Sequence, residues 1–124
     1  HLALERFLDL HTTNNKFEFP KDFIPRKYYD NVVGIYVNEE LPVVNLKIRV
    51  YGVQTEYMRM LPLHKSQREG ASKYGEFAEF SYRVCLTPEL KSKIQALGSD
   101  VEVLEPAEYR EEIKKEISAT LNRY

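Results

Sequence analysis

The stretch from Val43 to Tyr51 constrains the fold most, because from Val44 onward its side chains alternate between apolar and polar. One set of alternate positions is apolar, and the other carries amide, ammonium, guanidinium and phenol groups. Successive side chains of a strand point to opposite faces of the sheet. The stretch therefore predicts a strand with one buried and one solvated face. The apolar set is Val44, Leu46, Ile48 and Val50, and the polar set is Asn45, Lys47, Arg49 and Tyr51.

The period changes after this strand. Helical spacing places Val53, Tyr57 and Leu61 on one stripe, which predicts a helix that buries this stripe. Pro62 ends the helix, because a proline disfavours helical backbone at the residue before it. A short polar strand is expected next, at residues 65–69.

The second half of the chain repeats the pattern. Residues 78–86 alternate again and predict a long strand. A helix should then begin at the N-cap Thr87 and end near Gly98, followed by a short strand at residues 101–103. Pro106 opens a last helix. Its apolar stripe is Tyr109, Ile113, Ile117 and Leu121.

The order from Val43 onward is thus strand, helix, strand, strand, helix, strand, followed by a helix. This is the ferredoxin-like α+β arrangement, an antiparallel sheet of order 4-1-3-2 with an added C-terminal helix. The polar stretch 65–69 should be the edge strand opposite the fourth strand, because natural sheet edges carry charge against intermolecular pairing.

The first third of the chain has a weaker pattern. Residues 2–10 predict a strand, and residues 13–42 a linker whose phenylalanines and tyrosines lie on neighbouring surface, with a short helix between Pro25 and Asp30. A strand without a partner should dock on a second copy or on the sheet. The chain begins with His1 in mid-pattern, so we expect a longer polypeptide.

Composition excludes several classes of function. The net charge of −1 argues against non-specific binding of nucleic acid, and the single cysteine, Cys85, excludes an internal disulfide. No segment is apolar enough to span a membrane and no signal peptide is visible, so we expect a cytoplasmic protein. The histidines His1, His11 and His64 are isolated, and no catalytic motif occurs. We therefore expect no enzyme, no cofactor and no metal.

The candidate ligand contacts are polar residues of the loop and of the sheet. His64, Lys65 and Gln67 lie in the stretch HKSQREG, where the plainer interpretation of His64 is a loop-stabilising histidine. The open sheet face should present Lys47, Arg49 and Arg83, with solvent or a partner protein as the plainer interpretation. RNA recognition through stacked aromatics is disfavoured, since KYGEFAEFSY places Glu76 and Ala78 at the stacking positions.

Several segments resemble, in the right order, those of bacterial WYL-domain transcriptional regulators. The tail LGSDVEVLEPAEYREEIKKEI is similar to their closing segment, and LPLHKSQRE to their Leu-Pro-Leu-His-x-Ser-Gln loop. LERFLDL resembles the end of the WYL core, with Arg6 at a basic position of that core. KFEFPKDFIPRKYYDNVVGIYV resembles the connecting stretch.

The resemblance implies an architecture. Residues 1–12 would be the last strand of the WYL barrel, residues 13–42 a linker, and residues 43–124 the ferredoxin-like extension called WCX. DNA would be bound by an N-terminal helix-turn-helix that this chain lacks. The resemblance also implies a homodimer and a nucleotide or single-stranded nucleic acid as effector, with Arg6 as a ligand contact.

Two other interpretations stay open. The chain could be a stand-alone ferredoxin-like domain that binds a small molecule. It could also be a module that binds single-stranded nucleic acid directly on its sheet, which would show as salt-dependent binding.

Overall fold

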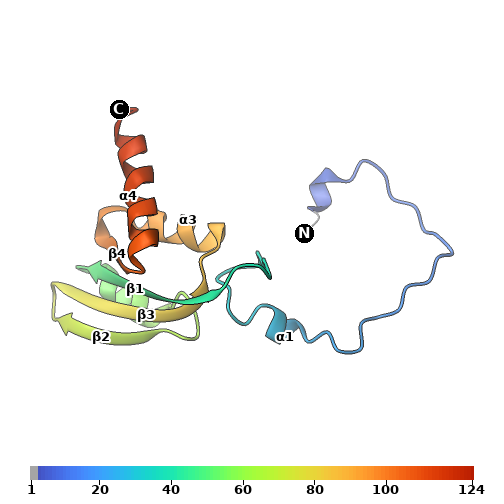
Figure 1. Ribbon diagram of the computed structural model, residues 1–124, viewed down its shortest axis with the longest axis horizontal. Helices are drawn as coiled ribbons and strands as arrows, with labels where there is room; N and C mark the ends of the chain where they lie inside the picture. The colour runs from blue at the N-terminus through green and yellow to red at the C-terminus, as the bar shows by residue number, and fades with distance from the viewer. Residues whose placement is uncertain (1–2) are drawn as a thin grey trace.

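A four-stranded antiparallel sheet forms the centre of the computed structural model, which describes residues 3–124 (Figure 1). β1 (Val43–Tyr51) and β3 (Phe77–Cys85) are central, with β2 (Arg68–Lys73) on one edge and β4 (Val101–Glu105) on the other. The order β2-β3-β1-β4 is the predicted 4-1-3-2 order read from the opposite edge. The fold is α+β and ferredoxin-like, which confirms the prediction from the order of elements.

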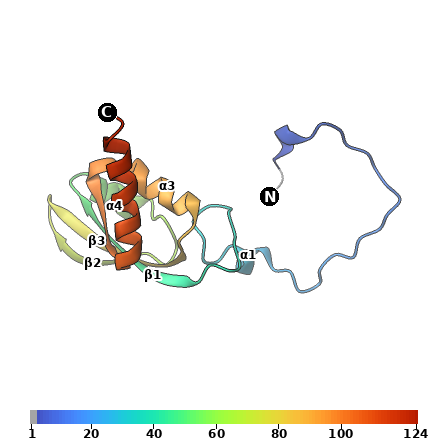
Figure 2. The same ribbon diagram turned by 45° about the horizontal axis from the view of Figure 1, so that its top comes forward.

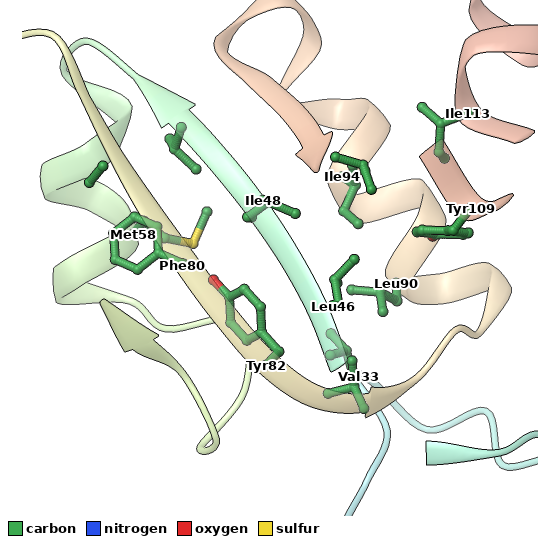
Figure 3. Packing of buried hydrophobic residues seen from close by; sticks show 14 residues of the cluster. Val33, Leu46, Ile48, Met58, Phe80, Tyr82, Leu90, Ile94, Tyr109 and Ile113 are labelled. Carbon is green, nitrogen blue, oxygen red and sulfur yellow. The ribbon is translucent and has the colours of Figure 1, made fainter. Parts of the chain in front are cut away.

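Three helices pack against one face of the sheet: α2 (Gln54–Met60), α3 (Pro88–Ala96) and α4 (Ala107–Leu121). Figures 1 and 2 both place α3 and α4 on the same side of it. The alternating apolar side chains of β1 and β3 meet the helices there, as Figure 3 shows. The buried cluster includes Leu46, Ile48, Val50, Ala78, Phe80, Tyr82 and Val84 of the sheet, with Met58, Leu90, Ile94, Tyr109 and Ile113 of the helices.

Helix α3 begins and ends where its sequence predicted. The hydroxyl of Thr87 accepts a hydrogen bond from the backbone N–H of Leu90 at 3.3 Å, satisfying one of the free donors of the first turn. Gly98 follows the helix with φ +58°, the left-handed backbone that glycine adopts without strain. The 3-10 turn η2 (Gly98–Asp100) then leads directly into β4.

The predicted stripe of α4 is buried only in its first half. Tyr109 and Ile113 belong to the core, whereas Ile117 and Leu121 are exposed, Ile117 by 56%. The helix continues past the sheet, so its later turns have no surface to cover (Figure 1).

The predicted buried stripe of α2 is wrong. Val53 and Leu61 are 70% and 75% exposed, and Tyr57 is exposed as well. The buried face carries Thr55 and Met58 instead. The physical reason is that this short helix has apolar side chains on both faces, and the position of the sheet decides which face it covers.

The predicted edge strand is displaced along the sequence. The strand forms at Arg68–Lys73, and residues 64–67 make a turn closed by the N–H of Gln67 on the carbonyl of His64 at 3.0 Å. All six residues of β2 are exposed, so no apolar alternation marks its position. A register shift between Glu69 and Ser72 further interrupts its pairing with β3.

The strand predicted at residues 2–10 is also wrong for the described residues, which begin at 3. Leu4–Arg6 form a 3-10 turn, η1, and residues 3–42 contain no strand. A strand needs a partner for its N–H and C=O groups, and this segment lies away from the sheet (Figure 1). The short helix is confirmed as α1 (Pro25–Tyr28).

The aromatic side chains of the linker behave in two ways. Phe17 and Phe19 are exposed, so the expectation that they lie on neighbouring surface is wrong for both. Phe23, Tyr28 and Tyr29 pack on one another, with ring centroids 5.3 Å and 5.1 Å apart.

The segment 30–41 is packed against the domain, unlike the residues before it. Val32 and Val33 are buried, and Val33 belongs to the core cluster. The carbonyl of Asn31 accepts a hydrogen bond from the N–H of Cys85 at 2.7 Å. Cys85 itself is buried, as expected of a lone cysteine in an apolar run.

Candidate functional site

A hollow of about 520 Å³ opens on the helix-free face of the sheet. Strand pairing brings its floor together, since Ser81 of β3 lies between Lys47 of β1 and Arg68 of β2. Asn45 and Arg83 face each other in the next pair. The turn before β2 closes one side. We call this site the basic hollow, and its polar lining consists of Asn45, Lys47, Lys65, Ser66, Gln67, Arg68, Ser81, Arg83 and Glu105.

The four cations of the basic hollow are not equally free. Lys47 Nζ lies 2.7 Å from Oε2 of Glu79, and the Lys65 ammonium pairs with the Asp30 carboxylate. The guanidinium groups of Arg68 and Arg83 have no ion-pair or hydrogen-bond partner within residues 3–124. The hollow therefore holds two guanidinium groups that form no ion pair with the described residues, and one acid, Glu105.

Paired polar side chains occupy the rest of the open face, and we call them the charge ladder: Glu79, Arg49, Glu102 and Tyr51. Glu79 is 6% exposed and accepts from Lys47 and, at 2.6 Å, from Nη2 of Arg49. These two hydrogen bonds, that of Lys47 foremost, lower the pKa of Glu79. Arg49 also lies 3.5 Å from Oε1 of Glu102 and covers the Phe77 ring at 4.8 Å. The predicted contact Arg49 is thus engaged by its neighbours.

The phenol of Tyr51 extends this ladder to β4. It donates to Oε1 of Glu102 at 2.6 Å, and this hydrogen bond is the largest cause that raises the pKa of Tyr51. Arg110 of α4 binds the other oxygen of Glu102 at 3.1 Å. The ladder is internally compensated, because each carboxylate in it already meets cations or a phenol.

His64 holds a loop together. Its Nε2 donates to the carbonyl of Asp30 at 2.9 Å, which fixes the proton on that nitrogen. Its Nδ1 is 2.8 Å from Oγ of Ser66 and accepts from the N–H of Ser66 at 3.2 Å. Burial lowers the pKa of the ring. The neutral form suits these partners, which supports the plainer interpretation of His64.

Gln67 lines the basic hollow, but its amide is already bonded. Oε1 accepts from the hydroxyl of Tyr82 at 2.8 Å and from the N–H of Leu63 at 3.3 Å. Nε2 donates to the carbonyl of Met58 at 2.8 Å. Gln67 therefore ties the turn to α2 and β3.

A second hollow, of about 430 Å³, lies between α3, β4 and α4. Its lining is largely apolar and includes Ile94, Val101, Ile113 and the exposed Ile117. Sequence reasoning did not predict this site.

Two further properties concern the described part of the chain only. No group of three or more His, Cys, Asp or Glu side chains suited to a metal ion occurs in residues 3–124. No helix within the same range is both long and apolar enough to cross a bilayer.

Comparison with protein-family models matches the WCX domain to residues 42–121, which comprise the whole sheet and helices α2 to α4. The chain belongs to the WCX family. A search of curated proteins gave no match.

The WCX fold brings four of the predicted ligand contacts together. Lys47, Lys65, Gln67 and Arg83 all line the basic hollow. Arg49 and His64 lie beside it and are bonded to protein groups. Arg6 is in η1, far from the sheet (Figure 1).

Sequence reasoning missed Arg68 and Glu89. Arg68 stands in the predicted polar edge, and its pairing with Ser81 would have placed it on the open face had the register been known. Glu89 of α3 anchors the segment ahead of the WCX match, since its Oε2 accepts from the N–H groups of Ile35 at 2.8 Å and Tyr36 at 2.6 Å. No local sequence signal links residues 54 positions apart.

Proposed function

We propose that this WCX domain is the C-terminal regulatory domain of a WYL-type DNA-binding transcriptional regulator, where it senses an effector and dimerises. The family match over residues 42–121 carries the proposal. The basic hollow supports the sensing role, because its unpaired guanidinium groups are open to a ligand. The segment LERFLDL would then belong to the preceding WYL core, and the protein would act in the cytoplasm.

The regulatory step is a shift between two dimer geometries. An effector that binds one geometry more tightly raises its population, which changes the separation of the two DNA-reading helices. Those helices would belong to a helix-turn-helix that precedes this chain in the regulator. The domain itself contributes binding and assembly, without catalysis.

The exposed half of α4 is the surface we propose for dimerisation. Ile117 and Leu121 continue the stripe of Tyr109 and Ile113 beyond the body of the domain. A helix stripe that extends past its own core fits the same stripe of a second copy, and Ile117 borders the apolar hollow there.

Light scattering over a dilution series tests this surface. We expect a dimer, and Ile117→Glu should shift it to the monomer. Val53→Glu is the matched control, because Val53 is an exposed apolar residue that immediately precedes α2, away from α4. A monomer at every concentration, or a dimer unaffected by Ile117→Glu, would contradict the proposed surface.

The reading frame upstream of His1 tests the assignment as a regulator. A helix-turn-helix and a WYL core there support it. An enzyme domain would instead favour a small-molecule-binding domain of ferredoxin-like type that controls that enzyme.

A further inference from the structure

We infer that the basic hollow binds the phosphate group of a small phosphorylated ligand, with Arg68 and Arg83 as the recognising residues. The inference rests on the proposed function and names the chemical class of its effector. Both guanidinium groups line the hollow from neighbouring strands, and neither has a partner within residues 3–124. A guanidinium presents paired N–H donors in one plane, which match two oxygens of a phosphate.

Neutral donors complete the site. The hydroxyl of Ser81 and the amide of Asn45 have no hydrogen-bond partner among the described residues, and both line the hollow. Ser81 stands between Lys47 and Arg68 in the sheet. A concave site with cations around it concentrates the positive potential on its floor. The free groups thus line one and the same hollow.

The surrounding acids limit the ligand to a compact anion. Glu105 lines the β4 side of the hollow, and Glu79 and Glu102 flank Arg49 in the adjacent row of the open face. A phosphate fits on the side of β2 and β3, near Arg68 and Arg83. A nucleic-acid strand crossing the sheet toward β4 would bring further phosphates against Glu105.

Base stacking is also disfavoured on this face of the sheet. Binding of single strands relies on bases stacked on aromatic side chains. The Phe77 ring on the open face is covered by Arg49, and the phenol of Tyr51 is bonded to Glu102. These aromatic groups are committed to the charge ladder.

Calorimetric titration of the chain with sodium pyrophosphate at low salt tests the inference. We expect binding to one site, weakened about tenfold or more by Arg68→Gln or by Arg83→Gln, as is typical for loss of a charged hydrogen bond. Arg123→Gln is the control, because it removes the same charge from an exposed position at the end of α4. It should leave the affinity unchanged.

Three outcomes would overturn the inference. They are no heat of binding at millimolar pyrophosphate, equal losses in the Arg83→Gln and Arg123→Gln variants, and binding of a dodecathymidine strand without binding of pyrophosphate. Light scattering on the same samples separates the two proposals. An intact dimer with no pyrophosphate binding rejects the phosphate site and leaves the regulatory domain standing.

Discussion

The contact between Gly34 and Glu89 allows one prediction to be worked through. Gly34 has φ +95°, and a Cβ added there would lie 2.6 Å from the carboxyl carbon of Glu89. An alanine in this backbone region costs about 1–2 kcal/mol. It would also push the carboxylate off the N–H groups of Ile35 and Tyr36, and we assign about 1 kcal/mol to this exposed pair of bonds.

Gly34→Ala should therefore lower the free energy of unfolding by about 2–3 kcal/mol. Gly75→Ala is the matched control, because Gly75 has φ +74° and nothing within 4 Å of its added Cβ. It should cost about 1–2 kcal/mol, the backbone strain alone. Urea unfolding of both variants measures the difference between them.

A double-mutant cycle isolates the contact. In a Glu89→Ala background, Gly34→Ala should lose only the strain, so the two substitutions together should fall short of their sum by about 1 kcal/mol. Hydrogen exchange at the Ile35 and Tyr36 amides should accelerate in either single variant. Strictly additive effects, or Gly34→Ala no more harmful than Gly75→Ala, would refute the reasoning.

Three further predictions concern burial and titration. The folded-state pKa of His64 is lowered by burial, so the unfolded chain binds the proton more tightly, and stability should fall as the pH drops below the unperturbed value of about 6.5. Urea titrations between pH 7.5 and 5.5 should show a smaller fall for His64→Gln, and equal falls would contradict this. Met58→Ala should cost about 2–5 kcal/mol and Tyr57→Ala less than about 0.5, and thermal unfolding that ranks them otherwise would reject the observed face of α2. Tyr82→Phe should lower the free energy of unfolding by about 1 kcal/mol or more, because it removes the hydroxyl that donates a hydrogen bond to Gln67 Oε1. Urea unfolding measures this loss, and an unchanged stability would argue against that hydrogen bond.

The sheet was predictable because burial leaves a period in the sequence. Leu46, Ile48 and Val50 alternate with polar residues, and Thr87 and Gly98 mark the ends of α3 by local backbone chemistry. These signals arise within a few residues of the chain. The strands β1 and β3 and the helix α3 were therefore predictable from the sequence.

The wrong predictions, for β2 and for the buried face of α2, concern features that depend on contacts distant in the sequence. Strand β2 is exposed throughout, so its position depends on pairing with β3 rather than on any pattern of its own. The buried face of α2 depends on where the sheet lies, and Met58 could be distinguished from Tyr57 only by that contact.

The same limit applied to the candidate site. Charge and position suggested Lys47 and Arg83, which do meet in the basic hollow. The carboxylates that pair with Arg49 come from other strands, so no pattern near Arg49 in the sequence indicates that its guanidinium is already paired. Arg68 remained hidden until the register of β2 was known.

Lys65 contributes to two contacts, since it lines the basic hollow and pairs with Asp30, the first residue of the packed segment 30–41. An anion in the hollow would compete with Asp30 for that ammonium. By reciprocity, dissociation of the segment 30–41 would free the Lys65 ammonium and raise the affinity of the hollow for the anion by the same factor. The turn at residues 64–67 would then couple the packing of the segment 30–41 to the binding of an anion in the hollow.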